Sequence, residues 1–202
     1  MVNKEFIVKE RRCQLAENKY DHLFISGVAP EIQARRPYAT LGFLDGKTFE
    51  GCNEYQFFWV GDKPYGSYGT KAWGEISHGP HEHKYPEIFV HLGTDPDNPY
   101  DLGGEVEMHM GPEKEKHIIT RSTIMCIPAN FPHGPWRILN VTRPFIIITI
   151  NQNPTHTEKA HREMIPEKDH NRMIFIDEGY QDAGIEPRFD WPELAGPPGD
   201  YL

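Results

Sequence analysis

Short apolar and alternating segments recur through the middle of this chain and are separated by residues that favour turns. From residue 38 to residue 151 the separators are Gly, Pro, Asn and Asp, which supply the backbone conformations that chain reversals need. Many short strands with frequent turns and no long amphipathic helix indicate an all-β sandwich or barrel. The predicted strands are residues 39–44, 55–60, 71–77, 87–92, 104–110, 116–120, 123–127, 136–140 and 145–151.

The two ends of the chain differ in texture from this strand-rich region. Residues 1–37 are mixed and charged, with a weak helical pattern at 31–36 that Pro37 ends. Residues 154–172 are charged and expected to contain helix, whereas 173–176 form an apolar run typical of a strand, and the Pro- and Gly-rich end is an irregular tail. We therefore expect an N-terminal extension (1–37), a central β region (38–151) and a C-terminal extension (152–202).

Length and charge narrow the class of protein. A chain of 202 residues is one domain, with or without extensions, and can bury a substantial core. Its formal net charge of −9 argues against nucleic acid as a partner, because phosphate contacts need clustered Lys and Arg. We expect neither a signal peptide nor a membrane span, since the polar start lacks an apolar core and the longest apolar run, 145–150, is too short.

The cysteines point to a reducing compartment. Cys13, Cys52 and Cys126 are odd in number and contain no close pair. We therefore expect a cytoplasmic protein with free thiols, in which Cys126, set in an apolar run, is a small core residue.

Histidines gather in residues 78–91, where a metal site is possible. His81 and His83 are two residues apart, so in a strand both side chains point to the same face. Pro86 cannot donate to a strand ladder and therefore marks a new strand that starts with Glu87. Two imidazoles and a carboxylate form a ligand set suited to Mn, Fe, Ni, Co or Zn. The alternative is a group of loop histidines near a turn.

A second signal lies downstream, in residues 128–133 (Pro-Ala-Asn-Phe-Pro-His). The two stretches together resemble the motifs of the cupin family, which are a Gly, His-x-His, a Glu and a later Gly, followed by Pro-x-Gly-x-x-His. The positions that match are Gly74, His81, His83, Glu87, Gly93 and His133. The resemblance covers about residues 38–151 and implies a jelly-roll (double-stranded β-helix) barrel. It also implies that one divalent transition metal is bound inside the barrel by His81, His83, Glu87 and His133.

This sequence departs from the cupin motifs at several positions, none of them a ligand. Gly74 and Gly93 are each displaced by one residue, and Ser122 and Arg137 stand where the second motif has Gly and Asn. Asn130 replaces the usual Gly of the second motif, a mild change because Asn tolerates positive φ better than most residues.

Other residues near the motifs could take part in chemistry, and each has an ordinary alternative. His91 lies on the same strand face as the expected carboxylate ligand and could act as a base in the cavity, or could end the strand in water. Arg137 could bind a substrate carboxylate, or form a surface ion pair. Tyr85 is a third candidate for catalysis, and Glu82 could also move a proton.

A further group of polar residues favours ordinary roles over ligation. His78 precedes a Gly-Pro turn and is either a loop residue or a ligand, and His109 is either inward-facing or exposed. The residues Asp95, Asp97 and Asp101 resemble a calcium loop, but the central Gly and distal Glu are missing, which favours a solvated connection.

The resemblance implies a metal-dependent enzyme acting on a small oxygenated substrate, with oxygenase or decarboxylase chemistry favoured. Redox-neutral lyase or isomerase chemistry, and ligand binding without turnover, remain alternatives. No nucleophile elbow, phosphate loop, dinucleotide fingerprint or Cys-x-x-Cys competes with this interpretation. We also expect a homodimer, because jelly-roll barrels leave sheet edges and an apolar outer face that need cover.

Overall fold

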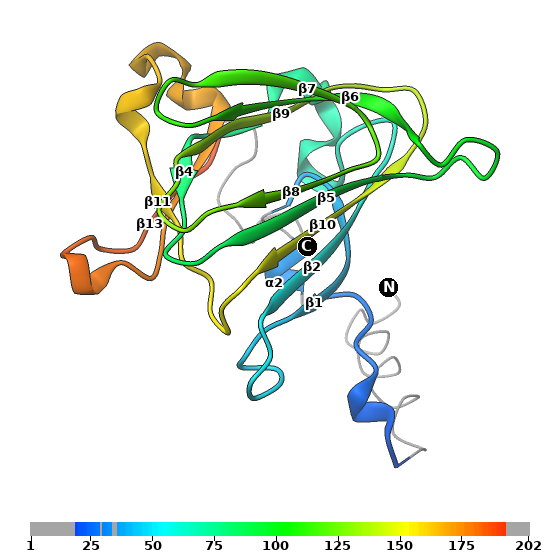
Figure 1. The fold of residues 1–202 in the computed structure, drawn as a ribbon, viewed down its shortest axis with the longest axis horizontal. Coiled ribbons are helices and arrows are strands. Elements are labelled where there is room, and N and C mark those ends of the chain that lie inside the picture. Colours follow the sequence, from blue (N-terminus) through cyan, green and yellow to red (C-terminus); the bar gives the residue numbers. More distant parts are fainter. Residues whose placement is uncertain (1–18, 29, 34–35, 193–202) are drawn as a thin grey trace, which may run out of the picture.

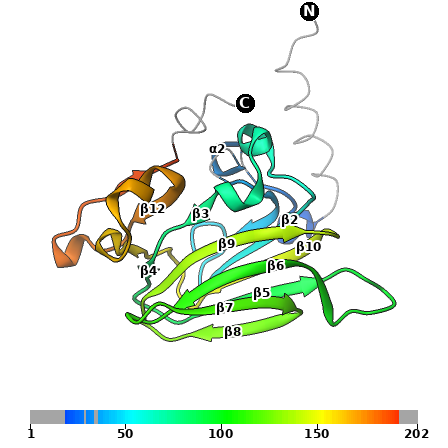
Figure 2. The same cartoon turned by 90° about the horizontal axis from the view of Figure 1, so that it is seen from above.

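Two β-sheets form the walls of a barrel in this computed structural model, which describes residues 19–28, 30–33 and 36–192 (Figures 1 and 2). The first wall is antiparallel and, within the described residues, has the strand order β1-β2-β10-β5-β8. Its members are β1 (Ala39–Leu44), β2 (Glu54–Val60), β10 (Phe145–Asn151), β5 (Glu87–Gly93) and β8 (Thr123–Ile127).

The second wall is built around β9 (His133–Val141), which pairs antiparallel with β6 (Asp101–Met110), β3 (Ser77–His78) and β4 (His81–Glu82). The outer neighbour of β6 is β7 (Glu115–Arg121). From β5 to β10 the chain crosses repeatedly from one wall to the other, which produces the jelly-roll barrel expected from the sequence.

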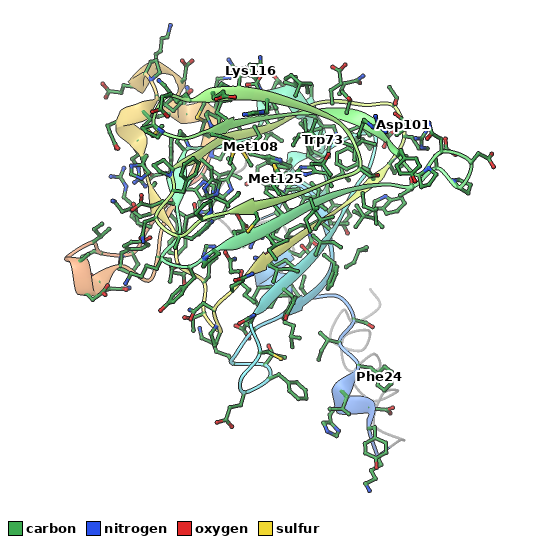
Figure 3. All side chains as sticks on the ribbon, in the orientation of Figure 1. Phe24, Trp73, Asp101, Met108, Lys116 and Met125 are labelled. Carbon is green, nitrogen blue, oxygen red and sulfur yellow. The ribbon has the colours of Figure 1, made fainter. Side chains whose placement is uncertain are left out.

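The core lies between the walls because alternate residues of each strand point inward. On β5, for example, Glu87, Phe89 and His91 are buried, whereas Leu92 is exposed. Figure 3 shows Met108 and Trp73 inside the barrel, and both are buried. The main cluster consists of Phe58, Val60, Trp73, Phe89, Leu102, Val106, Met108, Ile119, Ile127, Trp136, Ile138, Phe145 and Ile147.

The C-terminal extension is woven into the second wall. Within it, β11 (Lys159–Ala160) pairs with β4, and β12 (Met173–Asp177) runs parallel to β3 and pairs with β13 (Arg188–Asp190). Asp177 accepts a hydrogen bond from the backbone N–H of Ala160 at 2.9 Å and from Arg162 at 2.6 Å. The buried Asp177 carboxylate therefore joins β12 to the segment that contains β11 and Arg162, within the C-terminal extension.

The expected helix over residues 154–172 is wrong for most of its length. The segment begins with turns and β11, and it continues as two 3₁₀ helices, η4 (Arg162–Met164) and η5 (Glu167–Arg172). Pairing with β4 determines the conformation of this segment, which its charged composition alone does not reveal.

The expected strand over residues 71–77 is also wrong except at its end. A 3₁₀ helix, η3 (Trp73–Glu75), replaces it, because the Glu75 carboxylate accepts a hydrogen bond from the backbone N–H of Ala72 at 2.7 Å and closes the turn. Another 3₁₀ helix, η2 (Gly66–Thr70), precedes it, and η6 (Gln181–Ala183) lies in the C-terminal extension.

The expectation that Cys126 is a core residue is wrong. Cys126 is exposed, because on β8 it alternates with Met125 and Ile127, which face the core. Cys52 is half-buried and free, and Cys13 lies outside the described residues.

The N-terminal segment leaves the barrel as an arm. It carries η1 (Asp21–Leu23), and Phe24, 75% exposed, projects far from the sheets (Figure 3). After α2 (Pro30–Gln33), the Gln33 side chain donates to the carbonyl of Tyr38 and accepts from the N–H of Thr40, which ties the segment to β1. No helix in the described part of the chain is long and apolar enough to cross a bilayer.

Candidate metal centre

Four side chains, three from the first motif stretch and one from the second, converge at one end of the barrel. His81 lies on β4 and pairs in register with His133, the first residue of β9. His83 follows β4, and Glu87 is the first residue of β5. All four are buried, so the two strand starts and the intervening turn hold the set out of bulk water.

Backbone hydrogen bonds fix the orientation of the three imidazoles. His81 Nδ1 lies 2.8 Å from the carbonyl oxygen of Gly79, His133 Nδ1 lies 3.0 Å from that of Phe131, and His83 Nδ1 contacts that of Thr157. A carbonyl oxygen can only accept, so each Nδ1 carries the proton and each Nε2 has a free lone pair.

The free nitrogen atoms face one another and the carboxylate. Glu87 Oε2 lies 3.5 Å from His83 Nε2 and 3.4 Å from His133 Nε2. Both Nε2 atoms are buried without a hydrogen-bond partner, and the three histidines can offer ligand atoms within 4.8 Å of one another. Buried lone pairs of this kind are costly unless something binds them, so the residues fit a divalent cation.

The charge of Glu87 is stabilised by the same neighbours. Burial by itself would raise the pKa of Glu87, but the neighbouring imidazoles of His83 and His133 outweigh it and keep that pKa well below its ordinary value. Burial lowers the pKa of His81 well below its ordinary value. A carboxylate that stays ionised and an imidazole that stays neutral are the forms in which each binds a metal.

The departures from the cupin motifs are accommodated locally. Asn130 has φ +56°, the left-handed conformation expected of a residue that replaces Gly, and its N–H donates to the His83 carbonyl at 2.7 Å. Gly93 lies so close to the backbone of Asp101 that a Cβ there would collide with the Asp101 carbonyl oxygen.

A small internal cavity borders the candidate metal ligands. Its volume is about 50 Å³. Its walls are formed by Arg36, Tyr38, Gln56, Phe58, His78, His81, His83, Glu87, Phe89, Met108, Trp136, Thr149, Asn151, His156 and Glu158. One face is therefore polar and the other aromatic, which suits a small oxygenated molecule.

Comparisons with known proteins found matches among solved structures. No protein-family model and no curated protein matches the sequence. Similar solved structures include a variant of Bacillus subtilis oxalate decarboxylase (11% identity, TM-score 0.42, covering 74% of this chain and 34% of that chain). Others are a Klebsiella pneumoniae protein with a double-stranded β-helix domain (11%, 0.39, 62% and 79%) and a DMSP lyase from Ruegeria pomeroyi (16%, 0.32, 53% and 42%).

The likeness is one of fold. This chain spans about a third of the length of the oxalate decarboxylase chains that it matches.

The C-terminal extension adds acidic and imidazole groups that the sequence analysis missed. Glu158, 1% exposed, has an oxygen 2.8 Å from His78 Nε2, and His78 stacks on His81 with ring centroids 4.4 Å apart. His156 lies 3.5 Å from the same carboxylate. These residues lie on a segment taken for a polar helix, and only strand pairing brings them to the cavity, so no motif could have found them.

Of the other catalytic candidates, His91 alone is inside the barrel. It is fully buried, and its Nε2 accepts a hydrogen bond from Trp136 Nε1 at 3.1 Å. Burial lowers the pKa of His91 to about 3, so it is a neutral imidazole. It is absent from the cavity wall described above, and it packs behind Phe89, which it stacks on at 4.7 Å.

Arg137 and Tyr85 do not line this cavity. Arg137 alternates on β9 with the core residues Trp136 and Ile138, so it points outward, where it pairs with Glu107 at 3.1 Å. Tyr85 is 42% exposed at the turn before β5.

The remaining candidates are engaged in surface pairs. Glu82 contacts Lys159 and His161, and His109 contacts Glu107. Arg143 pairs with Asp101 and Asp95 in the connection before β6, which favours the solvated loop over a calcium site.

Proposed function

We propose that this chain is a divalent-metal-dependent enzyme of the cupin type that acts on a small oxygenated substrate, with oxygenase or decarboxylase chemistry favoured. The observation that carries the proposal is the orientation of the three imidazoles. Each Nδ1 is directed to a backbone carbonyl, so that each Nε2 lone pair is free for an ion of Mn, Fe, Ni, Co or Zn.

In this proposal, different residues of the site would bind the ion, exclude water and orient the substrate. His81, His83, Glu87 and His133 would hold the ion, and an ion with open positions supplies Lewis-acid activation of a substrate oxygen. The aromatic side chains of Phe58, Phe89 and Trp136 would exclude water from the opposite wall, and the amides of Gln56 and Asn151 could orient the substrate through hydrogen bonds.

A redox-neutral lyase or isomerase is the second candidate, and a specific feature favours it. Glu158 and His78 form a buried pair beside His81, where a carboxylate could accept a proton from a bound substrate. Burial would raise the pKa of Glu158, but the neighbouring imidazoles, first among them His78, outweigh it and keep the carboxylate ionised.

Two measurements test these proposals. Elemental analysis of protein purified without added metal should find about one transition-metal ion per chain, and His83→Ala should lose most of it, whereas His117→Ala, an exposed imidazole on β7, should lose none. Oxygen uptake on addition of Fe or Mn with small carboxylate or hydroxy substrates would support an oxygenase, and product without oxygen uptake would support a decarboxylase or the lyase. A ligand retained without product would leave a binding module.

A homodimer in the cytoplasm completes the proposal. The outer face of the first wall carries apolar side chains with large exposure, including Leu41 at 48% and Ile124 at 69%. Such a face needs cover in water, and a second copy of the same sheet would supply it.

A further inference from the structure

Arg36 is a partly buried cation to which the described residues offer no carboxylate. Its Nη2 donates to Gln56 Oε1 at 2.8 Å, and its guanidinium carbon lies 5.6 Å from the ring centroid of Phe58. Its Nε is buried without a hydrogen-bond partner, and no described Asp or Glu forms an ion pair with it. A guanidinium that keeps an unused donor can bind an anion that reaches it.

The carboxylates near Arg36 already have partners of their own. Glu54 accepts hydrogen bonds from two side-chain amides, at 2.6 and 2.9 Å. Glu158 is bound to His78, and Glu178 to His156 at 3.3 Å. None of these carboxylates forms a direct ion pair with Arg36, which is connected to Glu54 only through the Gln56 amide.

Arg36 also lines the small cavity that borders the candidate metal ligands. A second, more open cavity of about 340 Å³ lies outside it, between the first wall and the C-terminal extension, with Glu178 and Trp191 among its lining residues. Arg36, Gln56 and His156 line both cavities. A molecule that moves from the outer cavity to the metal ligands would pass the guanidinium.

We propose that Arg36 binds the carboxylate of a small anionic substrate whose second oxygen reaches the metal centre. A guanidinium presents paired N–H donors that match a carboxylate, and its free Nε offers one of them. The inner cavity holds only a few water-sized groups, which restricts the substrate to a short 2-hydroxy or 2-oxo carboxylate. The inference rests on the proposed function, because it places the second oxygen at the metal.

Calorimetric titration with glycolate and its neutral amide, glycolamide, tests the proposal on Mn²⁺-loaded protein. Arg36→Gln should weaken glycolate binding by about tenfold or more while leaving Mn²⁺ affinity and glycolamide binding unchanged. Arg137→Gln is the matched control, since it removes an arginine that lies outside the cavity and pairs with Glu107. It should leave glycolate binding unaffected.

The outcomes separate this inference from the metal proposal. Equal glycolate affinity in Arg36→Gln and the unsubstituted protein, with Mn²⁺ bound in both, overturns the role of Arg36 and leaves the metal centre standing. If Arg36→Gln does not fold, tighter binding of glycolate than glycolamide by the unsubstituted protein supports the anion site, and equal binding overturns it. A chain that binds no Mn²⁺ rejects the proposed function, and NMR then decides the inference: millimolar glycolate should move the Gln56 side-chain amide signals, and no movement overturns it.

Discussion

Removing one ligand of the metal centre should abolish the stabilisation that a divalent ion gives the fold. An ion that binds only the folded chain adds about 2.7 kcal/mol at a free concentration one hundred times its Kd. For a chain of this size each kcal/mol corresponds to about 2–4 °C. Mn²⁺ should therefore raise the Tm of metal-stripped protein by about 5–11 °C. In His133→Ala, which lacks one of the buried unpartnered Nε2 atoms, the rise should disappear.

The assay is thermal unfolding with and without the ion, after treatment with a chelator. The quantity to compare is the rise in Tm, because His133→Ala also changes the starting Tm by removing a buried side chain. His117→Ala is the control, since this imidazole is half-exposed on β7 and, within the described part of the chain, pairs only with Glu115. It should keep the full rise.

Two results would refute the reasoning. An undiminished rise in His133→Ala would mean that the ion binds elsewhere on the chain. No rise in the unsubstituted protein with Mn, Fe, Co, Ni or Zn would mean that no ion is part of the folded structure, and the barrel would then be a metal-free binding scaffold.

Three further predictions follow from pKa shifts and from the outer surface. Burial by itself would lower the pKa of His83, but the charge of Glu87 outweighs burial and raises that pKa. Protons therefore compete with the ion for His83, and the metal-induced rise in Tm should shrink as the pH falls from about 7 to about 5. The pKa of His91 falls from 6.5 to about 3 on folding, so the unfolded chain binds the extra proton between these values and the free energy of unfolding decreases as pH falls; in urea titrations His91→Gln should flatten this slope. Light scattering should give twice the 23.3 kDa chain mass, and Ile124→Asp should halve it; a single-chain mass for the unsubstituted protein would reject the dimer.

The strands of the barrel could be predicted because their signal is local. A period of two with turn residues between runs locates β1, β8 and β10 at their observed bounds, and most other strands within a few residues. The closeness of His81, His83 and Glu87 could be predicted for the same reason, since the three lie within seven residues, between the end of one strand and the start of the next. The tolerance of Asn for positive φ predicted that Asn130 could replace Gly in the second motif, and Asn130 has φ +56°.

Only the tertiary structure determines which other residues surround His81, His83 and Glu87, because strand pairings between segments distant in sequence leave no local pattern. Glu158 and His156 reach the cavity through the pairing of β11 with β4, some 77 residues apart at Lys159 and Glu82, which no periodicity in a charged segment could indicate. Of the two roles that the sequence left open for Arg137, strand parity favours the ion pair with Glu107, and the arginine that lines the cavity is Arg36. A short-range pattern determines which face a residue takes within its own strand, whereas the packing of distant segments decides which residues share a cavity.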